Sequence, residues 1–203
     1  MDLHRLEIEL KKRLIYPYRW GRKQSDSWDR ETNFIYVTNS FQELLKKTRS
    51  LDANIRDYAL NRWYNYWSAM GAEYIFSTHP QVSPNKNIYD KLVDFTIEDI
   101  PFDHKTTVFP GGFPHSVHYA LEHKQELIEW LYLNQSQQGR KHLKNRLFIV
   151  LHDPSGRHWK LKSEIQLIKA AIDFYLKNFS SKNLLEIVID KNEIQADIIW
   201  ILK

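Results

Sequence analysis

An uninterrupted run of five apolar residues, Leu147 to Leu151, stands in the second half of the chain. A continuous apolar run of this length between polar neighbours is typical of a strand buried on both faces of a sheet. Helices are needed to cover both faces, and amphipathic helical patterns occur on either side of the run, over about 117–133 and 162–179. The sequence therefore predicts an α/β fold with a mixed central sheet flanked by helices.

Periodicity and turn residues predict the remaining elements. Helices are expected over 2–14, 41–49 and 52–70, the last of them ending near Gly71. Strands are expected over 34–38, 74–77, 184–189 and 198–202, with a loop over 80–87. Two further β-rich runs, 92–97 and 102–108, are separated by four residues and predict a hairpin. We divide the chain into a basic N-terminal extension, residues 1–50, packed on a core domain of residues 51–203.

Composition excludes several classes of protein. The absence of cysteine removes disulfides, thiol nucleophiles and cysteine-bound zinc or iron–sulfur sites. No apolar run approaches the roughly 20 residues needed to cross a bilayer, and the N-terminal segment lacks the apolar core of a cleaved signal. With six glycines, the sequence has no glycine-rich phosphate loop. We therefore expect a cytoplasmic protein that does not span a membrane.

The surplus of positive charge is concentrated near the N-terminus. The chain has 29 Lys and Arg against 25 Asp and Glu, and residues 1–50 hold 11 of the former and 7 of the latter. Cations neutralise phosphates and aromatic faces stack on bases. The segment from Lys11 to Lys23, which is basic and aromatic without any acid, therefore predicts a nucleic-acid contact, with Lys12, Arg19 and Arg22 as candidates. A solvated basic surface is the alternative.

The predicted hairpin carries the residues with the most distinctive chemistry. Alternation along its second strand places Asp103 and Lys105 on one face and His104 on the other, where a core or interface position is expected. A two-residue turn brings Asp94 opposite Asp103, whereas a four-residue loop brings Asp94 opposite Lys105. Either register clusters two carboxylates and one lysine.

Two facing carboxylates repel each other unless a positive charge joins them. Lys105 supplies one such charge, and a divalent cation would supply more. Carboxylate oxygens suit Mg²⁺, which takes one or two protein carboxylates together with water and phosphate oxygens. A neighbouring lysine can orient a water or stabilise charge on phosphate. These are the components of metal-dependent phosphodiester hydrolysis; the alternative is a cross-strand salt bridge between Asp94, Asp103 and Lys105 in a purely structural protein.

Asp94, followed after eight residues by Asp103, His104 and Lys105, resembles the motif of the PD-(D/E)XK nuclease superfamily, which has the restriction-endonuclease-like fold. The expected order of helix, strand, hairpin, helix and strand is similar to the core of that family. The resemblance implies that Asp94 and Asp103 bind Mg²⁺, that the main-chain carbonyl of His104 adds a ligand, and that Lys105 serves the attacking water. The family often carries a glutamate on its first helix. Here Glu73, near the following expected strand, is the candidate for that role.

The end of the second core helix supplies further candidates. The resemblance places this helix end near the metal site, so Gln135, Gln138 and Arg140 are candidates for contacts with phosphate or bases, with a polar helix terminus as the alternative. We expect a Mg²⁺-dependent nuclease that acts on DNA, with RNA as the other substrate class, and the resemblance makes a homodimer plausible. The alternative is a catalytically inactive nucleic-acid-binding or protein-interaction module of the same fold.

Overall fold

The computed structural model of the chain describes residues 1–19, 26–87, 92–134 and 143–203. The chain divides into two compact units: unit 1 comprises Met1–Ala72 and Lys162–Gln166, and unit 2 comprises Glu73–Leu161 and Leu167–Lys203. The boundary lies inside one long helix, later in the chain than the division at residue 50 that the charge pattern suggested. No helix in the described ranges combines the length and apolar character needed to cross a membrane.

Unit 1 is helical. Its elements are α1 (Leu3–Lys12), η1 (Arg13–Ile15), α2 (Asp26–Glu31), η2 (Asn33–Val37), α3 (Phe41–Lys47) and most of α4 (Ala53–Ser77). The apolar stripe of α1 buries Leu6 and Leu10, as its spacing predicts. Ser40 caps α3 by accepting a hydrogen bond from the Glu43 N–H at 3.5 Å. These two helices confirm the sequence prediction.

The strand expected over 34–38 is wrong, because this segment forms the 3₁₀ helix η2. Short apolar runs suit a strand and a buried helical turn equally well. Two tryptophans of α4 donate hydrogen bonds to carbonyl groups of this segment, which in a strand would accept from a neighbouring strand. Trp67 donates to the Ile35 carbonyl at 3.0 Å, and Trp63 donates to the Thr38 carbonyl at 2.6 Å.

Helix α4 continues past Gly71, so the predicted stop at that residue and the predicted strand over 74–77 are both wrong. Gly71 makes room inside the helix. A Cβ there would lie 2.8 Å from Leu6 Cδ2 and 3.2 Å from Ile165 Cδ1. The extra turns bury Ile75 and Phe76 and place Glu73 on a helix.

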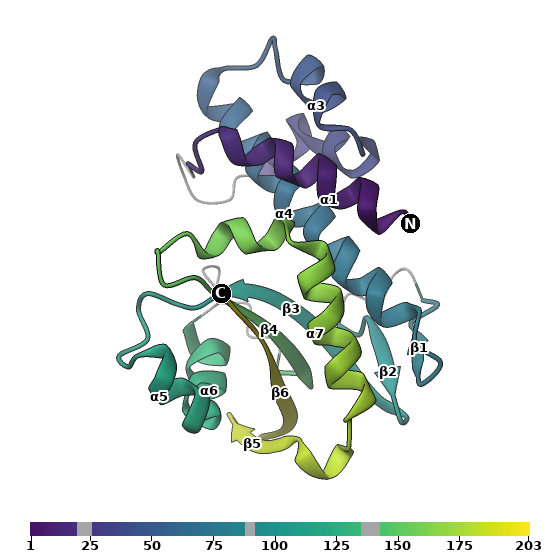
Figure 1. Cartoon of the computed structure of the whole chain (residues 1–203), viewed down its shortest axis with the longest axis vertical. Coiled ribbons are helices and arrows are strands. Elements are labelled where there is room, and N and C mark those ends of the chain that lie inside the picture. The colour runs from purple at the N-terminus through teal and green to yellow at the C-terminus, as the bar shows by residue number, and fades with distance from the viewer. Residues whose placement is uncertain (20–25, 88–91, 135–142) are drawn as a thin grey trace. The chain divides into compact units, whose positions relative to one another are not determined.

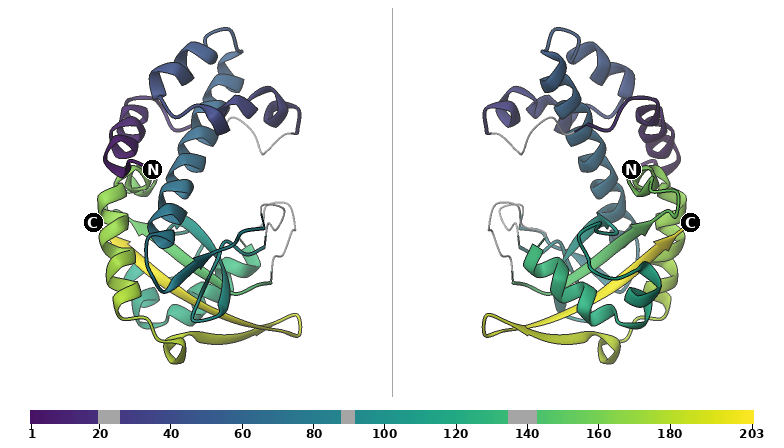
Figure 2. Two further views of the ribbon diagram at one scale, coloured as in Figure 1. Left: turned by 90° about the vertical axis from the view of Figure 1, so that its right-hand side faces the viewer. Right: turned by 90° about the vertical axis from the view of Figure 1, so that its left-hand side faces the viewer.

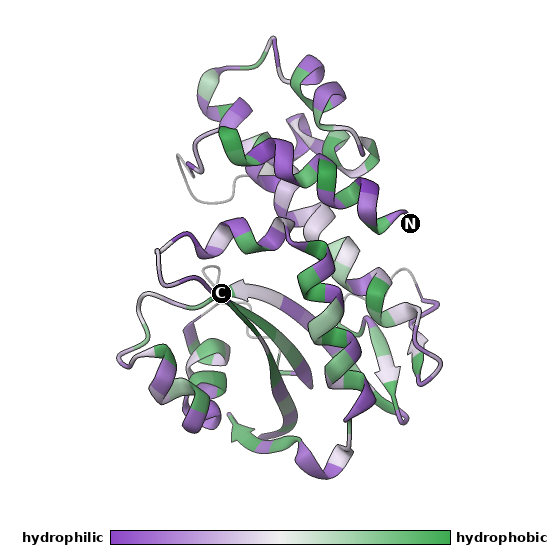
Figure 3. Ribbon diagram, in the orientation of Figure 1, coloured by the Kyte–Doolittle hydropathy of each residue, from purple (hydrophilic) through white to green (hydrophobic). Residues whose placement is uncertain are grey.

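Unit 2 is built on a six-stranded mixed sheet (Figure 1). Its strands are β1 (Val82–Pro84), β2 (Phe95–Ile97), β3 (Ile100–Val108), β4 (Arg146–His152), β5 (Leu185–Ile189) and β6 (Asn192–Leu202). The order is β1–β2–β3–β4–β6–β5, in which β4 is parallel to both neighbours and the other pairs are antiparallel. Leu147 to Leu151 are fully buried in β4, which Figure 3 shows as a predominantly hydrophobic strand. The predicted central strand is confirmed.

Helices cover the sheet on both faces. The helices α5 (Val117–Glu122) and α6 (Lys124–Asn134) share a core cluster with β4, β5 and β6, in which Leu127 and Leu131 meet Phe148 and Val150. The helix α7 (Ile165–Lys177) runs along the other face (Figure 2). The structure therefore shows a mixed α/β sheet flanked by helices.

Smaller differences from the predicted elements concern boundaries. The single helix expected over 117–133 is two helices, because His123 leaves the helical conformation. The segment 80–87 contains the short strand β1, and the helix expected from 162 begins at Ile165 after the 3₁₀ helix η3 (His158–Ser163). The last strand begins at Asn192, so β5 and β6 form a hairpin.

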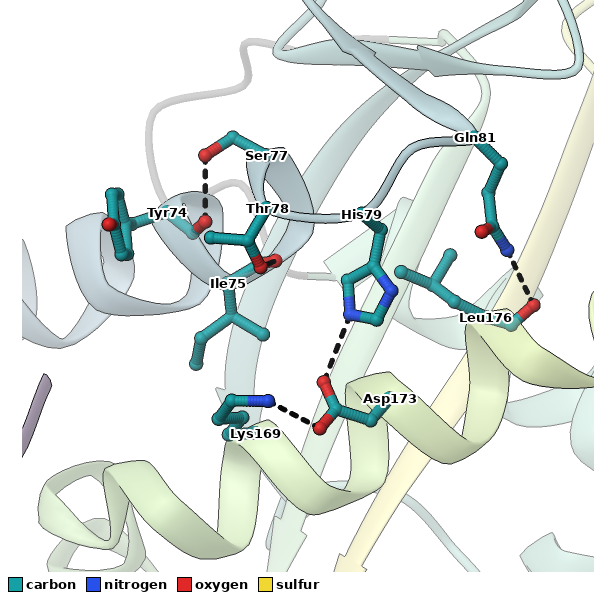
Figure 4. A network of polar contacts seen from close by, with 9 residues as sticks. All are labelled: Tyr74, Ile75, Ser77, Thr78, His79, Gln81, Lys169, Asp173 and Leu176. Atoms are coloured by element: carbon teal, nitrogen blue, oxygen red, sulfur yellow. Dashed lines mark hydrogen bonds and ion pairs between the residues drawn. The ribbon is translucent and has the colours of Figure 1, made fainter.

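A polar network ties the chain that follows α4 to α7 (Figure 4). His79 contacts Asp173 Oδ1 at 2.9 Å, and Lys169 donates to Oδ2 of the same carboxylate at 2.5 Å. Gln81 donates to the Leu176 carbonyl at 2.7 Å. The last turn of α4 is thereby anchored against the helix that covers one face of the sheet.

Candidate functional site

The hairpin of β2 and β3 has the two-residue turn, so the structure decides between the two predicted registers. Glu98 and Asp99 form the turn with φ of 50° and 66°, the left-handed conformation that such hairpin turns require. Ile97 pairs with Ile100, and this register brings Asp94 level with Asp103 at the open end of β2. The four-residue loop is excluded.

Asp94 is held by its own backbone and by a neighbouring loop. Its N–H donates to the Phe102 carbonyl at 2.8 Å, and its carbonyl accepts from the Asn85 N–H at 2.8 Å. Its Oδ2 atom accepts from two groups of one residue, the His104 backbone N–H at 2.8 Å and His104 Nδ1 at 2.7 Å. Burial alone would raise the pKa of Asp94, but these hydrogen bonds and the charge of His104 lower it.

His104 lies on the opposite face of β3 from Asp103, as strand alternation predicts, and it is buried. Its ring stacks on Phe95 with centroids 6.1 Å apart and also meets Phe76 of α4. Burial disfavours the imidazolium, yet the Asp94 carboxylate raises the pKa of His104, with smaller contributions from Asp103 and Glu73. His104 therefore fixes the orientation of Asp94 from the core side of the strand.

Asp103 is paired with Arg146, the first residue of β4. The two residues are partners in the parallel β3–β4 register. Arg146 Nε donates to Asp103 Oδ2 at 2.6 Å, and Nη2 contacts the same oxygen. The guanidinium also lies over the rings of Tyr132 and Phe148, at 5.5 and 5.7 Å from their centroids. Burial raises the pKa of Asp103; the charge of Asp94 adds to this rise and Arg146 opposes it.

Lys105 lies two residues further along β3, on the same face as Asp103, and it is exposed. It forms no ion pair or hydrogen bond with a residue in the described ranges. In the structural alternative, Lys105 would pair with these carboxylates; among the described residues it is Arg146 that pairs with Asp103. Desolvation by surrounding protein atoms and the charge of Arg146 lower the pKa of Lys105, and its exposed surface limits the size of this effect.

Glu73 lies on the last turns of α4 and is half-buried. Burial raises its pKa, Asp94 raises it further, and His104 lowers it. The sequence placed Glu73, the candidate for the family's helix glutamate, near a strand after the helix. Because α4 continues past Gly71, Glu73 lies within the helix itself, and the charges of His104 and Asp94 act on it.

The basic N-terminal segment is partly used by the fold of unit 1. Arg13 is buried and donates to the carbonyls of Tyr16 and Pro17 and to Asn61 Oδ1. Lys12 pairs with Glu9 at 2.5 Å and remains exposed. Arg19 is exposed, and its carbonyl accepts from Asn61.

Four of the predicted nucleic-acid contacts cannot be placed. Arg22, Gln135, Gln138 and Arg140 lie outside the residues that the structure describes. They stay predictions from the sequence.

Two side chains at this site were missed by sequence reasoning. Arg146 directly precedes the apolar run of β4, and no role was predicted for it from the sequence. Its position at the start of the expected central strand could have indicated that Arg146 lies near the carboxylates of the hairpin. The His104 side chain was assigned to the core, and its hydrogen bond to Asp94 has no signature in the spacing.

The donor set fits a Mg²⁺ ion held by few protein ligands. Within the described ranges, no three His, Asp or Glu side chains are grouped to hold a metal by themselves. Mg²⁺ needs only one or two carboxylates beside water and phosphate oxygens. Asp94 and Asp103 each use Oδ2 for nitrogen donors, and no described nitrogen donates to either Oδ1 atom. The hairpin register places Asp94 level with Asp103 on the neighbouring segment, and the charge of Asp94 contributes to the raised pKa of Asp103.

Comparison with known proteins yields no family for this chain: no family model, no curated protein and no solved structure matches it. The function proposed below therefore rests on the residues of the hairpin and of β4.

Proposed function

We propose that this chain is a metal-dependent nuclease that hydrolyses phosphodiester bonds in DNA, on a restriction-endonuclease-like core. The observation that supports the proposal is the alignment of Asp94 with Asp103 beyond the two-residue turn, with Lys105, which has no ion pair among the described residues, on the Asp103 face of β3. Asp94 and Asp103 would hold Mg²⁺, with the His104 carbonyl and Glu73 as further candidate ligands. When bound, the ion would neutralise the facing carboxylates and stabilise the negative charge that develops on phosphate.

The other residues of the site have roles that follow from their contacts. His104 orients Asp94 through two hydrogen bonds to one oxygen, which leaves the second oxygen directed elsewhere. Lys105 forms no ion pair with a described residue, although the charges of Asp103 and Asp94 act on it, so it is suited to orient the attacking water and to draw phosphate toward the carboxylates. Its lowered pKa brings it closer to exchanging a proton with that water.

Contacts with the rest of the nucleic acid are proposed for exposed basic and amide side chains. Lys12, Arg19 and Arg22 are the candidates for the phosphate backbone, and Gln135, Gln138 and Arg140 are the candidates nearer the scissile bond. Of these, Lys12 would exchange its pair with Glu9 for a phosphate, so its contribution should be the smallest of the basic three.

A second candidate function is favoured by one observation. Arg146 already neutralises Asp103, and a site whose carboxylate is occupied by a protein cation has less need of a metal. The same core would then act as a nucleic-acid-binding or protein-interaction module without catalysis.

Nicking of supercoiled plasmid in Mg²⁺ or Mn²⁺ tests the proposal. We expect wild-type protein to nick DNA and Lys105→Met to lose about 100-fold or more in rate. Lys144→Met is the matched control. Lys144 is an exposed lysine just before β4, the strand that pairs with β3, and its substitution should keep the wild-type rate. Asp94→Asn should abolish both nicking and Mn²⁺ binding measured by calorimetry.

The outcomes separate the two candidates. Protein that binds DNA in a salt-dependent way but cleaves neither DNA nor RNA with either metal supports the inactive module. Protein that neither binds nor cleaves nucleic acid contradicts the nuclease and leaves only an interaction module. Cleavage of RNA but not DNA would support the metal-dependent hydrolysis and show that the substrate is RNA instead of DNA.

A further inference from the structure

Arg146 uses only part of its hydrogen-bonding capacity on Asp103. A guanidinium carries five N–H groups in a planar fork, so that one arginine can hold two anions at once. Nε and Nη2 of Arg146 both contact a single oxygen of Asp103, Oδ2. Among the described residues, none accepts a hydrogen bond from Nη1. The edge of the guanidinium that carries Nη1 is therefore open to a second anion.

Two aromatic rings hold this guanidinium in addition to Asp103. It lies over the ring of Tyr132 on α6, at 5.5 Å from the centroid, and over the ring of Phe148 on β4, at 5.7 Å. Aromatic faces attract a cation whichever anion it binds. Arg146 therefore stays beside the carboxylates when the charge of Asp103 is shared with another partner.

A second cation lies on the same face of the sheet. Lys105 pairs with Phe148 in the register of β3 with β4, two residues along from the pair of Asp103 and Arg146. Lys105 and Arg146 are therefore diagonal neighbours on adjacent strands. Desolvation lowers the pKa of Lys105, and the charge of Arg146 lowers it further. A phosphate that met both side chains would relieve this repulsion.

We propose that Arg146 binds a phosphate of the nucleic acid through the edge that carries Nη1, and thereby makes metal binding at Asp103 depend on the nucleic acid. The inference rests on the proposed function and gives it a further substrate-binding residue. In the free protein, the guanidinium offsets the single negative charge of Asp103 and weakens its attraction for a metal. A phosphate on Arg146 offsets the guanidinium in turn, so Asp103 attracts the metal more strongly.

This coupling resolves the competition between Arg146 and a metal for Asp103. Without nucleic acid, the carboxylate keeps its protein cation and the pair stabilises the start of β4. With a phosphate present, both cations are useful, because negative charge on the phosphate is then shared between them. Arg146 is thus a reason for weak metal binding in the free protein and not for the absence of a metal site.

Calorimetry of Mn²⁺ binding without DNA tests the competition. Arg146→Gln should bind Mn²⁺ about fivefold or more tightly than wild type, because the competing cation is gone. Burial raises the pKa of Asp103 and Arg146 opposes the rise, so the titration is run at about pH 8 to keep this carboxyl ionised in the variant. A purely structural Arg146 would give the opposite sign, since its loss would weaken Mn²⁺ binding. Arg157→Gln, at an exposed position, is the matched control and should leave the affinity unchanged.

A short DNA duplex tests the coupling. In the Lys105→Met background, in which cleavage is lost, the duplex should tighten Mn²⁺ binding, and adding Arg146→Gln should reduce this effect by about fivefold or more. Without metal, Arg146→Gln should make the slope of log K against log salt shallower by about one, as expected for one lost phosphate contact.

Arg146→Lys tests whether the charge or the shape of the guanidinium matters. It keeps the positive charge but not the planar fork. Without DNA it should therefore bind Mn²⁺ as weakly as wild type, and with DNA it should show only part of the coupling. Circular dichroism confirms that each variant is folded.

The outcomes distinguish this inference from the proposed function. Mn²⁺ binding by wild type that Arg146→Gln does not tighten overturns the inference and leaves the proposed function standing. An unchanged salt slope also overturns it, since Arg146 would then contact no phosphate. If wild type and every variant fail to bind Mn²⁺, the proposed function and the inference both fail.

Discussion

Arg146 donates from Nε to Oδ2 of Asp103 at 2.6 Å, across two parallel strands on which the residues are direct partners. Both side chains are largely buried, with 11% and 21% of their surface exposed. Removing one charge of such a pair leaves the other uncompensated. The pair therefore stabilises the edge of the candidate site and competes there with any metal.

Arg146→Met should lower the free energy of unfolding by about 2–4 kcal/mol at neutral pH, because it leaves the Asp103 carboxylate without its cation. Urea unfolding measures the change. The double variant with Asp103→Asn should be more stable than the sum of the single effects predicts, with a coupling of about 1–3 kcal/mol. Additive single effects would show that the two side chains do not interact in solution.

Lys105→Met should change the free energy of unfolding by no more than about 0.5 kcal/mol, because Lys105 is exposed and unpaired among the described residues. The same urea titration measures it. A loss of stability comparable with that of Arg146→Met would mean that Lys105 has a structural partner, and it would weaken its assignment to the attacking water.

Glu9 predicts a pH dependence in unit 1. Its carboxylate accepts from the Phe41 N–H at 2.7 Å and from Lys12 at 2.5 Å. Burial alone would raise the pKa of Glu9, but these two hydrogen bonds lower it below its usual 4.5. A carboxyl group whose pKa is lower in the folded state stabilises that state at any pH above the pKa it has in the unfolded chain. This stabilisation is lost as the pH falls through the pKa of the folded state.

Glu9→Gln should therefore lower the free energy of unfolding by about 1–2 kcal/mol at pH 7, and the difference from wild type should shrink below pH 4.5. Urea unfolding at several pH values measures the difference. Glu31→Gln, at an exposed position, is the control and should show little effect at any pH. A difference that stays constant into acid would contradict the charged role of Glu9.

Gly71→Ala should destabilise the protein although alanine favours helix. The added Cβ would meet Leu6 Cδ2 at 2.8 Å, and overpacking of this kind costs about 1–3 kcal/mol against a gain in helix propensity of about 1 kcal/mol. Gly111→Ala is the control, because a Cβ there meets nothing within 4 Å. Thermal unfolding measures both variants. If Gly71→Ala has the same unfolding midpoint as Gly111→Ala, the side chains of Leu6 and Ile165 move aside without destabilising the protein.

Parts of the candidate site follow from neighbouring residues alone. Strand alternation put Asp103 and Lys105 on one face, and the turn limited Asp94 to two registers. Left-handed φ values at Glu98 and Asp99 then selected one of them. The ion pair of Asp103 could not be predicted from its neighbours in the sequence, because its partner Arg146 is 43 residues away.

The sequence by itself determined the fold class, because the burial of Leu147 to Leu151 and the amphipathic helices depend on local composition and period. Only the tertiary structure decided that 34–38 is helical and that α4 continues past Gly71, since indole donors and a close approach by Leu6 overrode the local signals. It also decided the pairing of β3 with β4. The register between distant parallel strands is set by the packing of the helices that connect them, and no local pattern specifies it.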